Sequence, residues 1–199
     1  MRAVLLSMLV LLAPTLARAA DLLVSVRTAS GRPVADAVVT LPDVHGPSHL
    51  SGPYRMAQHD LQFDPFVLVV PVGAEVAFPN LDKVRHHVYS FSPAHPFELK
   101  LYGRDESRKV RFDKAGVIAL GCNIHDSMVA FILVTDAAAA AKTDANGLAV
   151  LHDVPAGDLT VRVWHPYLRA AGNTLTARGQ GRMAVTAEMR APPEHRGAY

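Results

Sequence analysis

Apolar and polar positions alternate with a period of two through much of this chain, which is the pattern of half-buried β-strands. Residues 21–27 show the alternation, a turn-forming run at 29–33 interrupts it, and residues 37–41 resume it. These segments predict two strands joined by a turn. The next segment, 42–54, is rich in Pro, Gly, His and Ser and predicts a loop.

A second series of short strands follows this loop. Alternating or continuous apolar residues occur at 58–63, 66–71, 74–78, 84–91 and 97–102. The charged segment 103–109 predicts a solvated turn, and residues 110–116 lead into two further strands within 116–134. The alanines at 137–141 predict a linker, because so short a run does not nucleate a helix by itself. The pattern therefore predicts an all-β protein.

Residues 1–19 show the pattern of an export signal. Arg2 precedes an apolar run at 4–12, and residues 17–19 have the small-x-small arrangement of a cleavage site. The apolar run is shorter than the roughly 20 residues of a membrane-spanning helix. We therefore expect residues 1–19 to be removed, leaving a periplasmic protein with no membrane span; an uncleaved anchor is the alternative.

Composition narrows the classes of function. The chain has 20 Lys and Arg against 18 Asp and Glu, and removal of Arg2 and Arg18 with the signal leaves 18 of each. A charge near zero, without a basic stripe, gives no reason to expect binding to nucleic acid. An exported chain with a single cysteine has no internal disulfide, so Cys122 is free, paired with another molecule or bound to metal.

The surroundings of Cys122 favour metal binding. His125 follows it after three residues and Met128 after six, in a loop between two apolar strands. A thiolate, an imidazole and a thioether together select a soft or borderline metal, above all copper. A second imidazole is available upstream, at His86 or His87. Because neighbouring side chains on a strand point to opposite faces, only one of these two can readily face the metal.

The order H…C-x2-H-x2-M, with G-x-x-V-x-F-x-N before the first histidine, resembles the cupredoxin family. The short ligand loop is most similar to that of amicyanin. The resemblance implies a Greek-key β-sandwich or barrel over residues 56–134 that binds one type 1 copper ion. The implied ligands are His86, Cys122, His125 and Met128.

The same resemblance implies supporting residues around the ligands. The family pattern places the first ligand six residues after Asn80, which is His86. His87 then occupies a position where many cupredoxins have an asparagine that links the two ligand segments. We therefore expect His87 and Asn80 to support the site, and direct ligation by His87 remains the alternative.

The two flanks resemble a different family. Residues 20–45 carry V-x-V-x4-G-x-P-V-x2-A-x-V-x-L, which is similar to the opening hairpin of carboxypeptidase regulatory-like domains, small transthyretin-like β-sandwiches. The pattern with which such domains end, T-D-x2-G-x3-L-x2-V-P-x-G-x3-V-x-V, lies within 137–190. Because neither flank has enough strands to bury a core alone, we expect one split β-sandwich and a flexible tail at 191–199. The alternative is a single cupredoxin with added strands at both ends.

The resemblance implies a blue-copper protein that transfers single electrons and is not itself an enzyme. The chain also resembles periplasmic proteins labelled with methylamine utilisation, and this resemblance implies a redox partner such as a c-type cytochrome or a periplasmic dehydrogenase. A copper carrier or storage protein would use the same donor atoms and is the alternative function. A copper enzyme would need an open coordination position or a second copper, and the sequence offers no extra H-x-H pair for one. We expect His45, His49 and His165 to be solvated or structural.

Overall fold

The computed structural model describes residues 19–191. The predicted export signal, 1–19, and the predicted tail, 191–199, lie outside the described residues except for one residue of each. Within the described part, the chain forms strands β1 to β17 and one short 3-10 turn, η1 (Ala171–Asn173), and it contains no α-helix. The prediction of an all-β protein is confirmed. No helix in this part is long and apolar enough to cross a membrane.

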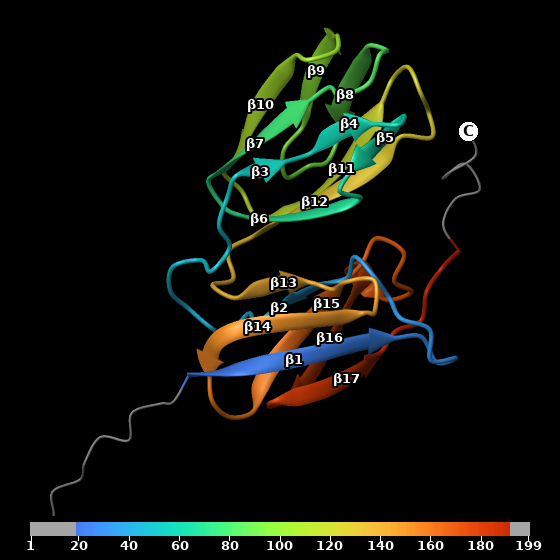
Figure 1. Cartoon of the computed structure of the whole chain (residues 1–199). Coiled ribbons are helices and arrows are strands. Elements are labelled where there is room, and N and C mark those ends of the chain that lie inside the picture. Colours follow the sequence, from blue (N-terminus) through green and yellow to red (C-terminus); the bar gives the residue numbers. More distant parts are fainter. Residues whose placement is uncertain (1–18, 192–199) are drawn as a thin grey trace, which may run out of the picture.

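The strands form two lobes, which lie one above the other in Figure 1. The inner lobe, from the middle of the chain, consists of β3 (Tyr54–Arg55), β4 (Ala57–His59), β5 (Gln62–Asp64), β6 (Val67–Pro71), β7 (Ala74–Pro79), β8 (His86–Ser90), β9 (Phe97–Tyr102), β10 (Ser107–Phe112), β11 (Gly116–Cys122) and β12 (Val129–Thr135). The outer lobe consists of β1 (Ala19–Arg27), β2 (Val38–Thr40), β13 (Ala140–Lys142), β14 (Leu148–Pro155), β15 (Leu159–Trp164), β16 (Thr174–Gly179) and β17 (Arg182–Thr186).

Two sheets and a hairpin enclose the core of the inner lobe. One sheet has the strand order β6-β12-β11-β8-β9, the other has the order β10-β7-β3, and β4 pairs with β5. In β11 alternate residues face inward: Ile118, Leu120 and Cys122 are buried, and Val117 and Ala119 are exposed. The strands hold Cys122 at the rim of an otherwise apolar core.

The outer lobe joins strands from both ends of the described chain. Its sheets have the orders β14-β1-β17 and β13-β2-β15-β16. β1 pairs antiparallel with β14 and parallel with β17, and β2 pairs with both β13 and β15. Its buried core comes from residues within 22–41 and 139–187, whereas the core of the inner lobe comes from residues within 56–134.

Three segments differ in detail from the sequence-based prediction. The segment 58–63 forms the β4–β5 hairpin, because the chain reverses at Asp60 and Leu61, which both have left-handed backbone angles. The charged segment 103–109 is a turn only in its first part, because β10 begins at Ser107 and pairs along β7. The alanine run at 137–141 is partly strand, since Ala140 and Ala141 pair with β2.

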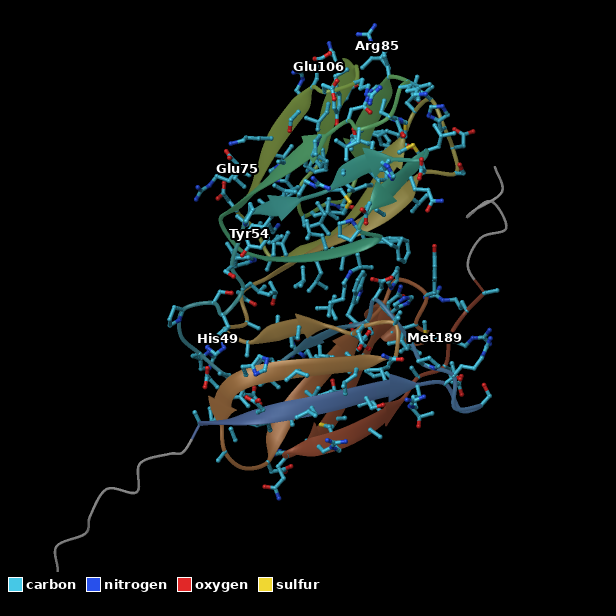
Figure 2. All side chains as sticks on the ribbon, viewed as in Figure 1. His49, Tyr54, Glu75, Arg85, Glu106 and Met189 are labelled. Atoms are coloured by element: carbon cyan, nitrogen blue, oxygen red, sulfur yellow. The ribbon has the colours of Figure 1, made fainter. Side chains whose placement is uncertain are left out.

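A small apolar cluster joins the lobes. Val38 and Trp164 from the outer lobe pack with Val67 of the inner lobe. Phe131 on β12 meets the Trp164 ring edge-on, with 6.1 Å between ring centroids, and Phe66 packs on Phe131 in the same way. This junction lies against β6 and β12, so the opposite end of the inner lobe stays clear of the outer lobe. Figure 2 shows Arg85 and Glu106 at that opposite end.

Candidate metal centre

His86 is the first residue of β8 and is wholly buried. Val88 and Ser90 share its inward face, while His87 and Tyr89 are partly exposed on the other face. The two neighbouring histidines therefore point to opposite sides of the sheet, as a strand requires. His86 follows Arg85, which places this end of β8 at the end of the inner lobe that is remote from the outer lobe (Figure 2).

Cys122 ends β11, and a tight loop connects it to β12. The two strands pair from Gly116 and Val134 down to Gly121 and Val129, so the loop is anchored on both sides. Within the loop, the N–H of Met128 donates to the carbonyl of His125 at 3.0 Å. This turn directs the imidazole of His125 back toward Cys122.

The structure brings one ring nitrogen of each histidine close to the cysteine sulfur. Cys122 Sγ lies 3.6 Å from Nδ1 of His86 and 4.0 Å from Nδ1 of His125. One donor atom from each of the three residues lies within 4.8 Å of the other two, an arrangement that can hold a metal ion. We call these three residues the metal cluster. It is the only such group of three or more His, Cys, Asp or Glu residues found in residues 19–191.

The spacing matches the geometry of a shared ion. Metal–sulfur bonds of about 2.3 Å and metal–nitrogen bonds of about 2.0 Å place the two donor atoms about 3.5 to 3.8 Å apart in tetrahedral or trigonal geometry. The distance from the sulfur to Nδ1 of His86, 3.6 Å, lies within this range, and the distance to Nδ1 of His125, 4.0 Å, lies just above it. A thiolate with two imidazoles is also a donor set that suits copper. The residues present therefore fit the predicted copper ion.

The surroundings of Cys122 favour its thiolate. Burial by itself raises the pKa of this thiol, but the hydrogen bond with His86 and the backbone groups of His87, Ile124 and His125 outweigh it and lower the pKa to about 6. For His86 burial acts in the opposite direction, and hydrogen bonds to Cys122 and Asp82 raise its pKa overall. The sulfur is thus prepared to bind a metal near neutral pH.

The other predicted site residues take different places. Met128 is buried in the same core cluster as Cys122, and both line a hollow of about 360 Å³. His87 lies outside the metal cluster, with Nε2 2.8 Å from the carboxylate of Glu98. The link from β8 to the ligand loop is made by the backbone, because the N–H of Asn123 donates to the carbonyl of His87.

Asn80 is wholly buried and braces the segment that leads into β8. Its side-chain amide donates to the carbonyls of Val84 at 2.8 Å and Tyr102 at 3.2 Å. Its amide oxygen accepts the N–H of Asp82 at 2.9 Å. Asn80 therefore acts on the site through the backbone before His86 rather than by touching the metal cluster.

Sequence reasoning missed one residue of the site. The carboxylate of Asp82 lies 2.7 Å from Nε2 of His86, on the side of the ring away from Cys122. The only signal in the sequence is a carboxylate four residues before a histidine, which is common on protein surfaces and has no specificity by itself.

The remaining histidines and soft donors lie elsewhere. Met56 is wholly buried in the core of the inner lobe. His59 contacts the exposed carboxylate of Asp60, and His152 pairs with Asp21 on the surface of the outer lobe. His49, seen beside the outer lobe in Figure 2, lines a shallow hollow together with His152. None of these residues belongs to the metal cluster.

Comparison with known proteins gives structural similarity at low sequence identity. No protein-family model and no curated protein matches the chain. A solved structure of amicyanin with Cu(I) and a methionine-to-alanine substitution has 17% identity and a TM-score of 0.39, and the match covers 49% of this chain and 98% of that one. A purple cupredoxin from Nitrosopumilus maritimus has 20% identity and a TM-score of 0.38, covering 42% and 100%.

A copper-containing nitrite reductase from Thermus scotoductus SA-01 is also similar. It has 25% identity and a TM-score of 0.41, and the match covers 56% of this chain and 28% of the reductase chain.

Proposed function

We propose that this chain is a periplasmic type 1 copper protein that transfers single electrons between redox partners. The observation that carries the proposal is the convergence of the Cys122 sulfur and one nitrogen each of His86 and His125 within 4.8 Å. Bound copper would supply a one-electron redox couple. The Cys122 thiolate, the imidazoles of His86 and His125 and the thioether of Met128 would hold it.

The scaffold suits fast electron transfer. Cys122 is the last residue of β11, and Met128 immediately precedes β12, its paired strand. His86 is the first residue of β8, which pairs with both β9 and β11. All three of these side chains are nearly or wholly buried. A site held in this way changes little between two oxidation states, so little energy is lost to rearrangement.

His125 is the ligand through which electrons would pass to a partner. It is the one member of the metal cluster that is partly exposed, and its neighbour Ile124 exposes about half of its surface. Phe91 and Val129 are further exposed apolar residues, and both line the hollow that reaches Cys122. A small apolar surface of this kind suits a transient complex with a c-type cytochrome or a periplasmic dehydrogenase.

We further propose that the outer lobe is the split carboxypeptidase regulatory-like domain and that residues 1–19 are the export signal. In support, the segments that resemble the two ends of such a domain pair in one sheet, through β1 and β14. The junction between the lobes lies at the end of the inner lobe opposite Arg85 (Figure 2). The outer lobe therefore does not cover the metal end, which stays open to partners.

The decisive experiment adds Cu(II) to the purified exported form and records the visible spectrum. We expect an intense thiolate-to-copper absorption band that is lost in Cys122→Ser and in His86→Ala. His87→Ala is the matched control, since this neighbouring histidine points away from the metal cluster, and it should keep the band. Loss of the band in His87→Ala with retention in His86→Ala would reverse the assignment of the ligand.

The same sample separates electron transfer from copper carriage. An electron-transfer protein should keep its copper when a chelator competes, and should exchange electrons rapidly with a c-type cytochrome. Tight but colourless binding, with ready loss of copper to the chelator, would contradict the proposal and favour a carrier.

A further inference from the structure

The β4–β5 turn has a connection that its own hairpin does not need. Asp60 and Leu61 both have left-handed backbone angles, with φ of 51° and 56°, although neither is glycine. Their two N–H groups point out of the hairpin and donate to the carboxylate of Asp82, at 2.7 and 3.1 Å. A two-residue turn of this hand normally uses glycine. Here the two hydrogen bonds to the Asp82 carboxylate accompany the unusual backbone angles, so the turn acts as a binding site for one carboxylate.

Asp82 is held from its other side as well. Its N–H donates to the buried amide of Asn80, and the N–H of Leu81 donates to the carbonyl of Gln58 on β4. The side chain of Asp82 is only 11% exposed. Both the backbone and the carboxylate of this residue are therefore fixed before it meets His86.

The third donor to the Asp82 carboxylate is a ligand of the metal cluster. Oδ2 accepts from Leu61 and also lies 2.7 Å from Nε2 of His86. An ionised carboxylate can only accept, so the hydrogen of the neutral imidazole must be on Nε2. The lone pair then lies on Nδ1, the atom that faces Cys122 at 3.6 Å.

We propose that Asp82 is a positioning residue, which the β4–β5 turn locks in place so that it fixes both the tautomer and the orientation of His86. The inference rests on the proposed function only in taking Nδ1 of His86 as the atom that binds the metal. A carboxylate behind a ligating histidine also makes the ring a stronger electron donor. Stronger donation favours the more positively charged oxidation state of copper, so Asp82 lowers the reduction potential.

Asp82→Asn tests this with almost no change of shape. An amide has one accepting oxygen where the carboxylate has two, and three donors converge on this group. At least one donor must lose its partner, and the negative charge behind His86 is gone. Asp82→Ala removes all three hydrogen bonds. Asp60→Asn is the matched control, since only the backbone of Asp60 binds Asp82 and its own side chain is 85% exposed.

Three measurements test the role of Asp82: the tautomer of His86, the affinity for Zn(II) and the reduction potential of the copper form. Nitrogen-15 NMR of the metal-free protein, recorded at a pH high enough for His86 to be neutral, should show His86 as the Nε2–H tautomer in the wild type and in Asp60→Asn, and a mixture of tautomers in Asp82→Ala. Zn(II), which also accepts thiolate and imidazole ligands, should bind about 10- to 100-fold more weakly to Asp82→Ala than to the wild type. The reduction potential of the copper form should rise in Asp82→Asn and stay unchanged in Asp60→Asn.

The outcomes separate this inference from the proposed function. Zn(II) affinity and the His86 tautomer that are unchanged in both Asp82 variants would overturn the positioning role, whatever the copper spectrum shows. A wild-type protein without a blue band, but with the expected tautomer and Zn(II) results, would overturn electron transfer and leave the positioning role standing. Circular dichroism of each variant excludes loss of fold as the cause.

Discussion

The two lobes are both small β-sandwiches, but their cores differ in chemistry. The buried cluster of the outer lobe is entirely aliphatic, built from Val, Leu and Ala side chains. The cluster of the inner lobe contains four aromatic rings, two methionines and Cys122. Gln58, Asn80 and His86 are buried beside it and are hydrogen-bonded.

This difference shows what a site adds to a fold. An aliphatic core needs only volume and shape, so its residues can be exchanged for others of similar size. Buried polar groups must each find partners, and those partners fix one arrangement. In the inner lobe the polar residues form a connected series from Gln58 through Tyr102 and Asn80 to Asp82 and His86. Metal binding and substitutions at the metal end of the inner lobe should therefore affect the stability of that lobe differently from substitutions in the outer lobe.

The largest expected effect is the response to metal. Copper at a free concentration 1,000-fold above its Kd would stabilise the folded inner lobe by about 4 kcal/mol. Hydrogen exchange should slow strongly in β8 and β11, which carry His86 and Cys122, and in β12, which anchors the ligand loop, and little in β1 and β14. Cys122→Ser should show no slowing in either lobe. Equal slowing in both lobes of the wild type would mean that they open as one unit, and would contradict the difference expected between the lobes.

The second test compares two glycines in matched positions. A Cβ at Gly121, beside Cys122, would lie 2.7 Å from the Tyr89 ring, whereas one at Gly179 in the outer lobe would meet the flexible side chain of Met183, with the sulfur at 3.2 Å. Gly121→Ala should cost about 1–3 kcal/mol in the free energy of unfolding, as overpacking does. Gly179→Ala should change it by less than about 1 kcal/mol. Urea unfolding measures both.

The Gly121 effect has an internal check. Tyr89→Leu removes the ring atoms that the new methyl group meets, so the double variant with Gly121→Ala should lose less stability than the sum of the two single variants. Strict additivity would show that the ring is not the cause. Equal costs at Gly121 and Gly179 would mean that the inner lobe is no less tolerant than the outer one.

The ligand loop shows how much of this site is local in sequence. Cys122, His125 and Met128 fall within one short connection, so their spacing alone predicts that they share one loop. The choice between His86 and His87 needs only strand alternation to limit it to one residue. Which of the two faces inward depends on the sheet, and the structure places His86 in the metal cluster.

Asp82 shows what the sequence could not provide. Its role depends on a turn at Asp60 and Leu61, within a segment whose apolar pattern predicts one continuous strand, 58–63. The left-handed angles of these two residues are stabilised by the carboxylate of a residue more than twenty positions away. Local propensity cannot reveal a turn whose stabilising partner is so distant. The start of β10 at Ser107, inside a charged segment, was missed because pairing with β7 decides it.

The smallest expected effect is the pH dependence of the metal-free protein. The folded-state pKa of Cys122 is about 6, against 9.0 for an ordinary thiol. A lowered pKa stabilises the fold fully above pH 9, and this contribution declines as the pH falls and is gone below about 6. The raised pKa of His86 acts in the opposite sense, because its contribution is present at low pH and is lost as the pH rises through the folded-state value. The two slopes oppose each other, so the net change in the wild type should be small.

Substitution separates the two contributions. In His86→Gln the thiolate loses its main hydrogen-bond partner, so the pKa of Cys122 should move back toward 9.0. The ultraviolet absorbance of the thiolate should then titrate at a higher pH in the variant than in the wild type, where the midpoint is about 6. Asp60→Asn, which leaves both residues untouched, should titrate like the wild type. An unchanged midpoint in His86→Gln would show that the backbone groups of the ligand loop alone hold the thiolate, and that the polar residues of the inner lobe do not act on the sulfur through His86.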